Sequence, residues 1–161
     1  MTFAEFREET DKLRYLYLDR IYYLGDNDLI VELMAARTEE STVEDDEAVR
    51  AEFGEKAAEL AKGCRRIVPD EGRKWRLTFE NCIASTVLNE SYWSGDRGTV
   101  DKEGRIVVTE DSDWLDYLRE ASFAHQIIDG IRHYEIRCLD HIVNVAADRE
   151  PDVEAAGEQG C

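Results

Sequence analysis

The chain has 161 residues, and 43% of them are hydrophobic, which is enough for one folded domain with a core. It carries 37 acidic side chains against 20 lysines and arginines, a formal net charge of −17. This charge opposes direct binding to nucleic-acid phosphate or to an anionic membrane surface, and it favours a basic protein partner. Because no apolar run resembles a signal peptide or a membrane helix, we expect a cytoplasmic protein without a membrane contact.

The first part of the chain predicts a helix followed by a hairpin. Residues 3–13 place apolar side chains at helical spacing and indicate a short helix. The runs 14–24 and 29–34 are rich in Tyr, Leu and Ile and flank a Gly-Asp-Asn-Asp turn, which predicts a β-hairpin. One long helix over residues 3–24 is the competing interpretation, and the clustered tyrosines favour strands.

Residues 44–62 predict one surface helix inserted into the domain. Ser41 or Thr42 can cap its N-terminus, the acids that follow suit the positive end of the helix dipole, and Gly63 ends it. One apolar stripe follows its length, formed by Val49, Phe53, Ala57 and Leu60 or Ala61.

The middle of the chain reads as strands. Pro69 ends the first of them, and the Asp-Glu-Gly sequence after it predicts a turn. Strict alternation in the second places Trp75, Leu77 and Phe79 on one buried face. The predicted strands cover residues 64–69, 75–79, 82–93 and 105–109.

The last part predicts a helix and two further strands. Ser112 or Asp111 caps a helix over 113–121. The alternation that follows in 132–139 directs three side chains inward, and 141–147 continues or pairs with that strand. The inward side chains are those of Tyr134, Ile136 and Cys138.

These elements do not alternate regularly between strand and helix, which disfavours a doubly wound parallel sheet. We therefore predict a mostly β, α+β fold: an antiparallel sheet or a β-sandwich with two or three short helices at its edges. Residues 1–150 form one globular domain that includes the helical insertion at 44–62. Residues 151–161 are small, polar and acidic, and they predict a disordered tail.

The stretch LTFENCIASTVLNESYW (77–93) resembles a pattern of a family of small, uncharacterised bacterial proteins. The resemblance extends to YLYLDRIYYLGDNDLIVEL and to HYEIRCLDHIVNV. It implies a bacterial, cytoplasmic, β-rich domain and carries over no catalytic residue. Small proteins of this kind often prove to be toxin antidotes or parts of phage-defence loci, which is an association and not a physical argument.

The residues that carry chemistry elsewhere form no recognisable motif here. His125, His133 and His141 are spaced by eight residues, unlike a compact zinc site, and exposed or loop positions are expected for them. Cys82 with one of these histidines is the one nucleophile pair to consider, but its apolar strand favours a buried structural thiol. We expect no cofactor, no metal and no enzyme activity, with an enzyme of unrecognised site as an alternative.

The acidic excess gathers in two segments. Residues 39–52 contain seven acids and one base, and residues 148–161 contain five acids and one base. Bases gather in 62–76, with six against two acids, and we expect them to pair with the acidic body rather than to bind an anion. An acidic, lysine-poor composition is also typical of adaptation to salt or of a biased genome, so acidity alone does not establish a partner.

The charge pattern predicts an acidic interaction protein that binds and neutralises a basic protein, such as a toxin or a nuclease, in the manner of an immunity protein. A DNA mimic or a phage-defence inhibitor is the alternative, and it needs carboxylates at phosphate-like spacing on rigid elements. The predicted contact residues are Glu44, Asp45, Asp46 and Glu47, with Asp113 and Asp116 as a second cluster.

Overall fold

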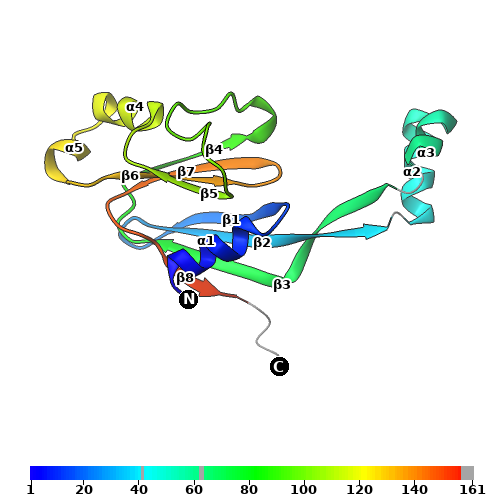
Figure 1. Cartoon of the computed structure of the whole chain (residues 1–161), viewed down its shortest axis with the longest axis horizontal. Helices are drawn as coiled ribbons and strands as arrows, with labels where there is room; N and C mark the ends of the chain where they lie inside the picture. Colours follow the sequence, from blue (N-terminus) through cyan, green and yellow to red (C-terminus); the bar gives the residue numbers. More distant parts are fainter. Residues whose placement is uncertain (41, 62–63, 157–161) are drawn as a thin grey trace.

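A computed structural model describes residues 1–40, 42–61 and 64–156 of the chain. Two four-stranded antiparallel sheets lie face to face, with short helices around them (Figure 1). This arrangement confirms the predicted mostly β, α+β fold. No helix in the described ranges is both long and apolar enough to cross a membrane.

The first sheet contains the predicted hairpin. Its turn places Gly25 and Asn27 at positive φ, the conformation that glycine and asparagine accept most readily. The strand order is β1-β2-β3-β8. The strands are β1 (Leu16–Leu24), β2 (Asp28–Glu40), β3 (Arg65–Phe79) and β8 (Asp152–Ala155).

The second sheet is built from the strands predicted in the middle and last parts of the chain, with the order β4-β7-β6-β5. The segment predicted as one strand over 82–93 ends earlier, at Asn89, where a short 3₁₀ helix η1 (Glu90–Tyr92) begins. The strands are β4 (Ala84–Asn89), β5 (Ile106–Thr109), β6 (Arg132–Arg137) and β7 (His141–Ala147).

The core lies between the two sheets. Trp75, Leu77 and Phe79 are all buried on one face of β3, as the alternation predicts, and the Phe79 ring meets Tyr134 of β6 edge-on, with centroids 5.3 Å apart. Helix α1 (Phe3–Asp11) closes this core, because Phe3 contacts Tyr134 of one sheet and Phe6 contacts Trp75 of the other. The Thr2–Glu5 capping box fixes the start of this helix.

Strands β2 and β3 continue well beyond the sandwich as a two-stranded ribbon. Past Ala35, β2 no longer pairs with β1, and residues 36–40 pair only with 65–69 of β3. The ribbon carries α2 (Val43–Phe53) and α3 (Glu55–Ala61) at its far end, away from both sheets (Figure 1). We call the described residues 36–40, 42–61 and 64–69 the arm.

The arm corrects the prediction of one helix over 44–62. Gly54 adopts φ 87°, outside the helical region, and divides the segment into α2 and α3. Thr42 caps α2, as one of the two predicted candidates, while Ser41 and Gly63 lie outside the described residues. The predicted apolar stripe is not covered, since Phe53 is 66% and Leu60 83% exposed.

Strand β3 corrects the prediction of two strands separated by a turn. Met34 pairs with Lys74 and the next residue, Ala35, pairs with Asp70, so the three residues between Asp70 and Lys74 are looped out of the ladder. β2 stays continuous beside this irregularity and holds both halves of β3 in one strand. Pro69 is tolerated because its half of β3 has no neighbour on the second side.

Strand β8 corrects the prediction of a disordered tail from residue 151. Pro151 and Val153 are buried, and residues 152–155 pair with β3 at the edge of the first sheet. The amino group of Met1 donates to the Val153 carbonyl, at 3.4 Å. Residues 157–161, including Cys161, lie outside the described part of the chain.

Helix α4 (Asp113–Ala121), the short α5 (Ala124–Ile127) and the loop 93–104 lie over the second sheet, on the face that points away from the core (Figure 1). Ser112, one of the two predicted candidates, caps helix α4, and the helix buries Leu115. The side chains of Trp114 and Leu118 are half-buried beneath it, while Ala121 is exposed.

Candidate functional site

The outer face of the second sheet presents a row of side chains from all four strands. The register places Thr86 beside Asn144, Asn144 beside Glu135, and Glu135 beside Val107. Glu135 is fully buried and Asn144 is 6% exposed. Polar residues that would face water in a simple two-sheet sandwich are therefore enclosed by α4 and the loop 93–104.

His133 lies in the same layer and is fully buried, which corrects the expectation of an exposed or loop-bound histidine. Its Nε2 lies 2.8 Å from Asn144 Oδ1, and its Nδ1 lies 3.0 Å from Ser112 Oγ. Because the amide oxygen only accepts, Nε2 carries the proton and Nδ1 accepts from the Ser112 hydroxyl. Asn144 in turn donates to Thr86 Oγ1. Desolvation lowers the pKa of His133, so the ring stays neutral.

The Ser112–His133–Asn144 chain contains the residue types of a hydrolytic triad, but its geometry is structural. Ser112 Oγ also accepts the Leu115 amide hydrogen and so caps α4. The serine is fully buried and both roles of its hydroxyl are occupied. A nucleophile needs access to its substrate, and this hydroxyl has none.

Glu135 fastens the loop 93–104 to the sheet. One carboxylate oxygen accepts from the Thr99 hydroxyl at 2.7 Å, and the other accepts from Arg137 Nε at 2.8 Å. Arg137 also donates to the main-chain carbonyls of Thr99 and Lys102, and its guanidinium lies 5.3 Å from the centre of the Trp93 ring. The buried carboxylate is therefore balanced by a cation that an aromatic face supports.

A hollow of about 340 Å³ opens above this polar row, which we call the aromatic hollow. Thr86, Asn144 and Glu135 contribute polar groups from the sheet, and Leu88 contributes an apolar one. Its remaining lining comes from η1, the loop after it and α4: Tyr92, Trp93, Ser94, Gly95, Asp96, Trp114 and Tyr117.

The aromatic side chains of this hollow differ in how firmly the protein holds them. The Trp114 ring packs against His133, with ring centres 4.9 Å apart, and Asp96 accepts the Trp114 amide hydrogen at 3.0 Å. Tyr92 and Tyr117, in contrast, are 86% and 62% exposed at the rim. The arrangement combines a buried polar floor with exposed rings, as small-molecule sites commonly do.

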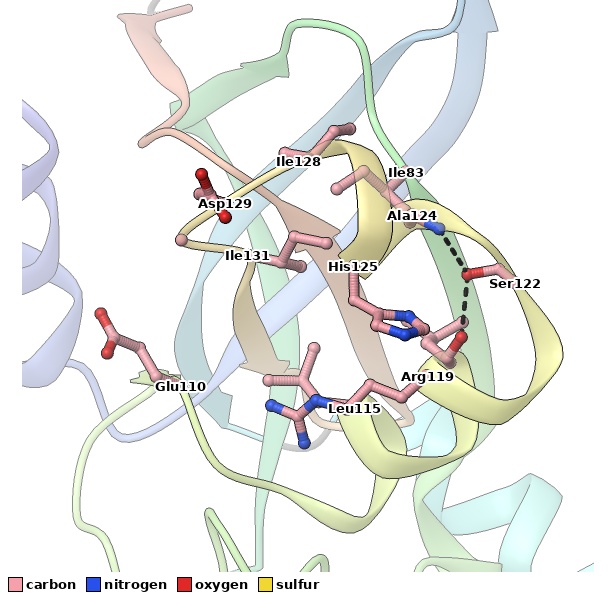
Figure 2. Close-up of a pocket in the computed structure, with 12 residues that line it drawn as sticks. Ile83, Glu110, Leu115, Arg119, Ser122, Ala124, His125, Ile128, Asp129 and Ile131 are labelled. Atoms are coloured by element: carbon pink, nitrogen blue, oxygen red, sulfur yellow. Dashed lines mark hydrogen bonds between the residues drawn. The ribbon is translucent and has the colours of Figure 1, made fainter.

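A second pocket, of about 270 Å³, lies between α4, α5 and the start of β6. His125 and Arg119 both line it, and Figure 2 shows Glu110 and Asp129 on the side away from Ser122. All four of these charged residues are exposed. Without a buried polar group to orient a ligand, this pocket is the weaker candidate.

The second predicted acidic cluster is an internal ion-pair network. Arg97 donates to Asp111, Asp113 and Asp116, at distances of 2.9 to 3.1 Å, and Arg119 also pairs with Asp116. Hydrogen bonds from Arg97 hold the pKa of Asp113 below its ordinary value. Two guanidinium groups thus offset most of the charge of these three carboxylates.

The first predicted acidic cluster lies on α2, at the tip of the arm. Asp45 accepts from Thr42 in a capping box and from Arg66 at 2.7 Å, so it serves the fold. Asp46 and Glu47 have no ionic partner among the described residues, and the side chain of Glu44 lies outside them. Figure 1 places α2 and α4 at opposite ends of the molecule, so the two predicted clusters do not form one surface.

Four of the predicted bases in 62–76 pair internally, as expected from the sequence, whereas Arg65 has no ion pair among the described residues. Arg73 binds Glu9, Arg76 binds Glu32, and Lys74 lies 3.8 Å from Asp19. Lys62 lies outside the described residues.

Cys82 is a buried thiol, as predicted, although it lies just before β4 and not within the strand. Burial raises its pKa, and its sulfur lies near the Ala84 and Ala146 carbonyls and the Tyr23 hydroxyl. In the described part of the chain, no histidine bonds to this sulfur. Comparisons of the chain with protein-family models, with curated proteins and with solved structures find no match.

Proposed function

We propose that this chain is an acidic interaction protein that binds a basic protein partner through the tip of its arm. The observation that carries the proposal is the position of the acids. Between residues 43 and 61 the chain has seven acidic and two basic side chains, and a ribbon holds this segment away from both sheets. A charged element in this position steers a partner of opposite charge towards one face.

The arm tip also offers an apolar contact. Phe53 and Leu60 are largely exposed, and Ala58 is the one buried hydrophobic residue of the described arm. Large exposed side chains next to unpaired carboxylates suit a partner surface with basic groups around an apolar centre. Strong acidity from adaptation to salt alone would not require the exposed phenylalanine and leucine.

Within this class, an immunity protein that neutralises a nuclease-like toxin is the specific form we favour. Proteins that cleave nucleic acid carry basic clefts, and electrostatic steering accelerates their capture. Co-expression with a toxin encoded next to this gene tests whether the protein is an immunity protein. The full chain is expected to restore growth, and a variant without α2 and α3, the helices at the tip of the arm, is not.

The alternative of a DNA mimic receives less support. A mimic needs one continuous row of free carboxylates, whereas the described acids on α4 are paired with Arg97 and those on α2 lie at the other end of the molecule. The same net charge also argues against direct binding to nucleic acid.

Affinity capture from the native cells tests the proposal. The double variant Asp46→Asn/Glu47→Gln removes two unpaired charges of the tip and leaves Asp45 as the helix cap. The matched control Asp101→Asn/Glu103→Gln removes the same charge from the exposed loop 93–104. We expect a basic protein to bind the full chain and the control, and to associate more slowly with the tip variant, with a flatter salt dependence. Equal association rates for all three proteins at low salt would contradict the proposal.

A further inference from the structure

We propose that the aromatic hollow binds an alkylated ammonium group, either on a free small molecule or on a methylated lysine side chain. The hollow lies on the second sheet, whereas the arm extends from the first, so this inference does not rest on the proposed partner site. Its volume of about 340 Å³ lies at the lower end of the range for small-molecule sites, roughly 300–1,000 Å³.

The charge of the lining selects a cation over an anion. Asp96 and Glu135 both line the hollow, and none of its lining residues is lysine, arginine or histidine. Arg137, which contacts the lining residues Trp93 and Glu135, is already paired with the Glu135 carboxylate. An anionic ligand would meet two carboxylates with no cation of its own to bind.

The aromatic side chains supply the attraction that an organic cation needs. Tyr92, Trp93, Trp114 and Tyr117 all line the hollow, and a cation over the face of such a ring is attracted by the negative charge of the π-system. The protein already uses this interaction at the same place, because the Arg137 guanidinium lies over Trp93. The lining therefore tolerates positive charge against its rings.

The hydrogen bonds around the hollow indicate an alkylated rather than a bare ammonium. The Asp96 carboxylate accepts the amide hydrogens of Gly98, Asp113 and Trp114. Both oxygens of Glu135 accept from Thr99 and Arg137. The carboxylates thus give the hollow a negative charge, but few of their oxygen lone pairs are free to accept a further hydrogen bond. A cation whose N–H groups are replaced by methyl groups loses nothing there and gains contact with the rings.

Tryptophan fluorescence provides the measurement. Trp93 and Trp114 line the hollow, while Trp75 is buried in the core and serves as an unchanging background. The probes are choline and its neutral isostere 3,3-dimethylbutanol, which has the same shape without the charge. We expect choline to change the fluorescence in a saturable way and the isostere to bind about tenfold more weakly or not at all.

Exposed rings make suitable variants because their loss leaves the fold intact. Tyr117→Ala and Tyr92→Ala each remove one rim ring and are expected to weaken choline binding by about threefold to tenfold. Phe123→Ala is the matched control, since Phe123 is 74% exposed and lines neither pocket. Equal binding of the neutral isostere, no saturable response to choline, or insensitivity to both tyrosine variants would overturn the inference.

A competition experiment with peptides distinguishes the two sources of the cation. A peptide with one trimethyl-lysine competes with choline if the hollow reads a modified polypeptide, and its unmodified lysine counterpart does not. Failure of both peptides to compete, with choline still bound, assigns the hollow to a free small molecule.

Discussion

His133 shows how a single buried side chain links several parts of this fold. Its ring bonds Ser112 at the start of α4 and Asn144 in β7, and it supports the Trp114 ring from behind. The bond to Ser112 needs the neutral ring, because Nδ1 accepts from the Ser112 hydroxyl, whereas the bond from Nε2 to Asn144 does not. The burial that lowers the pKa of His133 therefore also makes this region sensitive to acid.

This sensitivity predicts that the free energy of unfolding falls as the pH is lowered from 7 to 5. In the unfolded chain His133 gains its proton near its ordinary pKa of about 6.5, whereas in the folded chain the pKa is lower. The unfolded state then binds more protons, so the stability contribution is complete above the unfolded pKa and is lost below it. Chemical denaturation at several pH values should give a slope of at most about 1.4 kcal/mol per pH unit.

The variant His133→Gln serves as the control for this prediction, because glutamine does not titrate. It should be less stable than the natural chain at pH 7 but nearly independent of pH in this window. Identical pH profiles for the two proteins would show that groups other than His133 determine how the free energy of unfolding depends on pH.

Strand β8 is a short element that depends on one apolar side chain. Val153 is 7% exposed and packs into the common core, while its neighbours Asp152 and Glu154 face solvent. We expect Val153→Asp to lower the free energy of unfolding by roughly 2–4 kcal/mol, because it places an unpaired charge in that core. Urea denaturation measures this loss, and Glu154→Gln, an exposed change on the same strand, should cost little. A small effect of Val153→Asp would mean that β8 does not stay paired with β3.

The elements that sequence patterns predict well are those whose signal is local. Alternation locates the buried faces of β3 and β6, and Ser112 marks the start of α4. Local sequence patterns do not predict elements that depend on contacts with residues distant in the sequence. β8 has only one large apolar side chain, and the sequence Pro-Asp-Glu-Gly resembles a turn although the neighbouring strand β2 keeps β3 continuous.

The aromatic hollow could not be predicted for the same reason. Glu135 and Asn144 alternate with core residues and therefore appear solvent-facing in the sequence, yet α4 and the loop 93–104 cover them. The pairing of Arg97 with Asp113 and Asp116 joins residues that are 16 and 19 positions apart, and no local pattern indicates it. The helices that carry the predicted contact residues could be placed in advance, but the pairing of Asp113 and Asp116 with Arg97 could not.

At the scale of the whole molecule, the chain divides into a sandwich that holds the core and an arm that holds much of the charge. Both sheets and α1 contribute to one buried cluster, and no residue of the described arm belongs to it. The arm therefore adds surface and charge at little benefit to folding. An element of this kind is retained more readily for binding than for stability.

This division predicts that the sandwich folds without the arm. Ala35 and Asp70 face each other at the base of the ribbon, so residues 36–69 can be replaced by the two-residue turn Asn-Gly, which suits a tight hairpin. Among the described side chains of the arm, the only buried hydrophobic one lost is that of Ala58, and the shorter connection costs less entropy to close. We expect the free energy of unfolding to change by less than about 1 kcal/mol, with binding to the aromatic hollow preserved and capture of the basic partner abolished. Thermal and urea denaturation measure the change in stability. The choline titration measures binding to the aromatic hollow, and affinity capture measures binding of the basic partner. A loss of several kcal/mol would show that the arm supports the core, and retained capture of the partner would place its binding site on the sandwich.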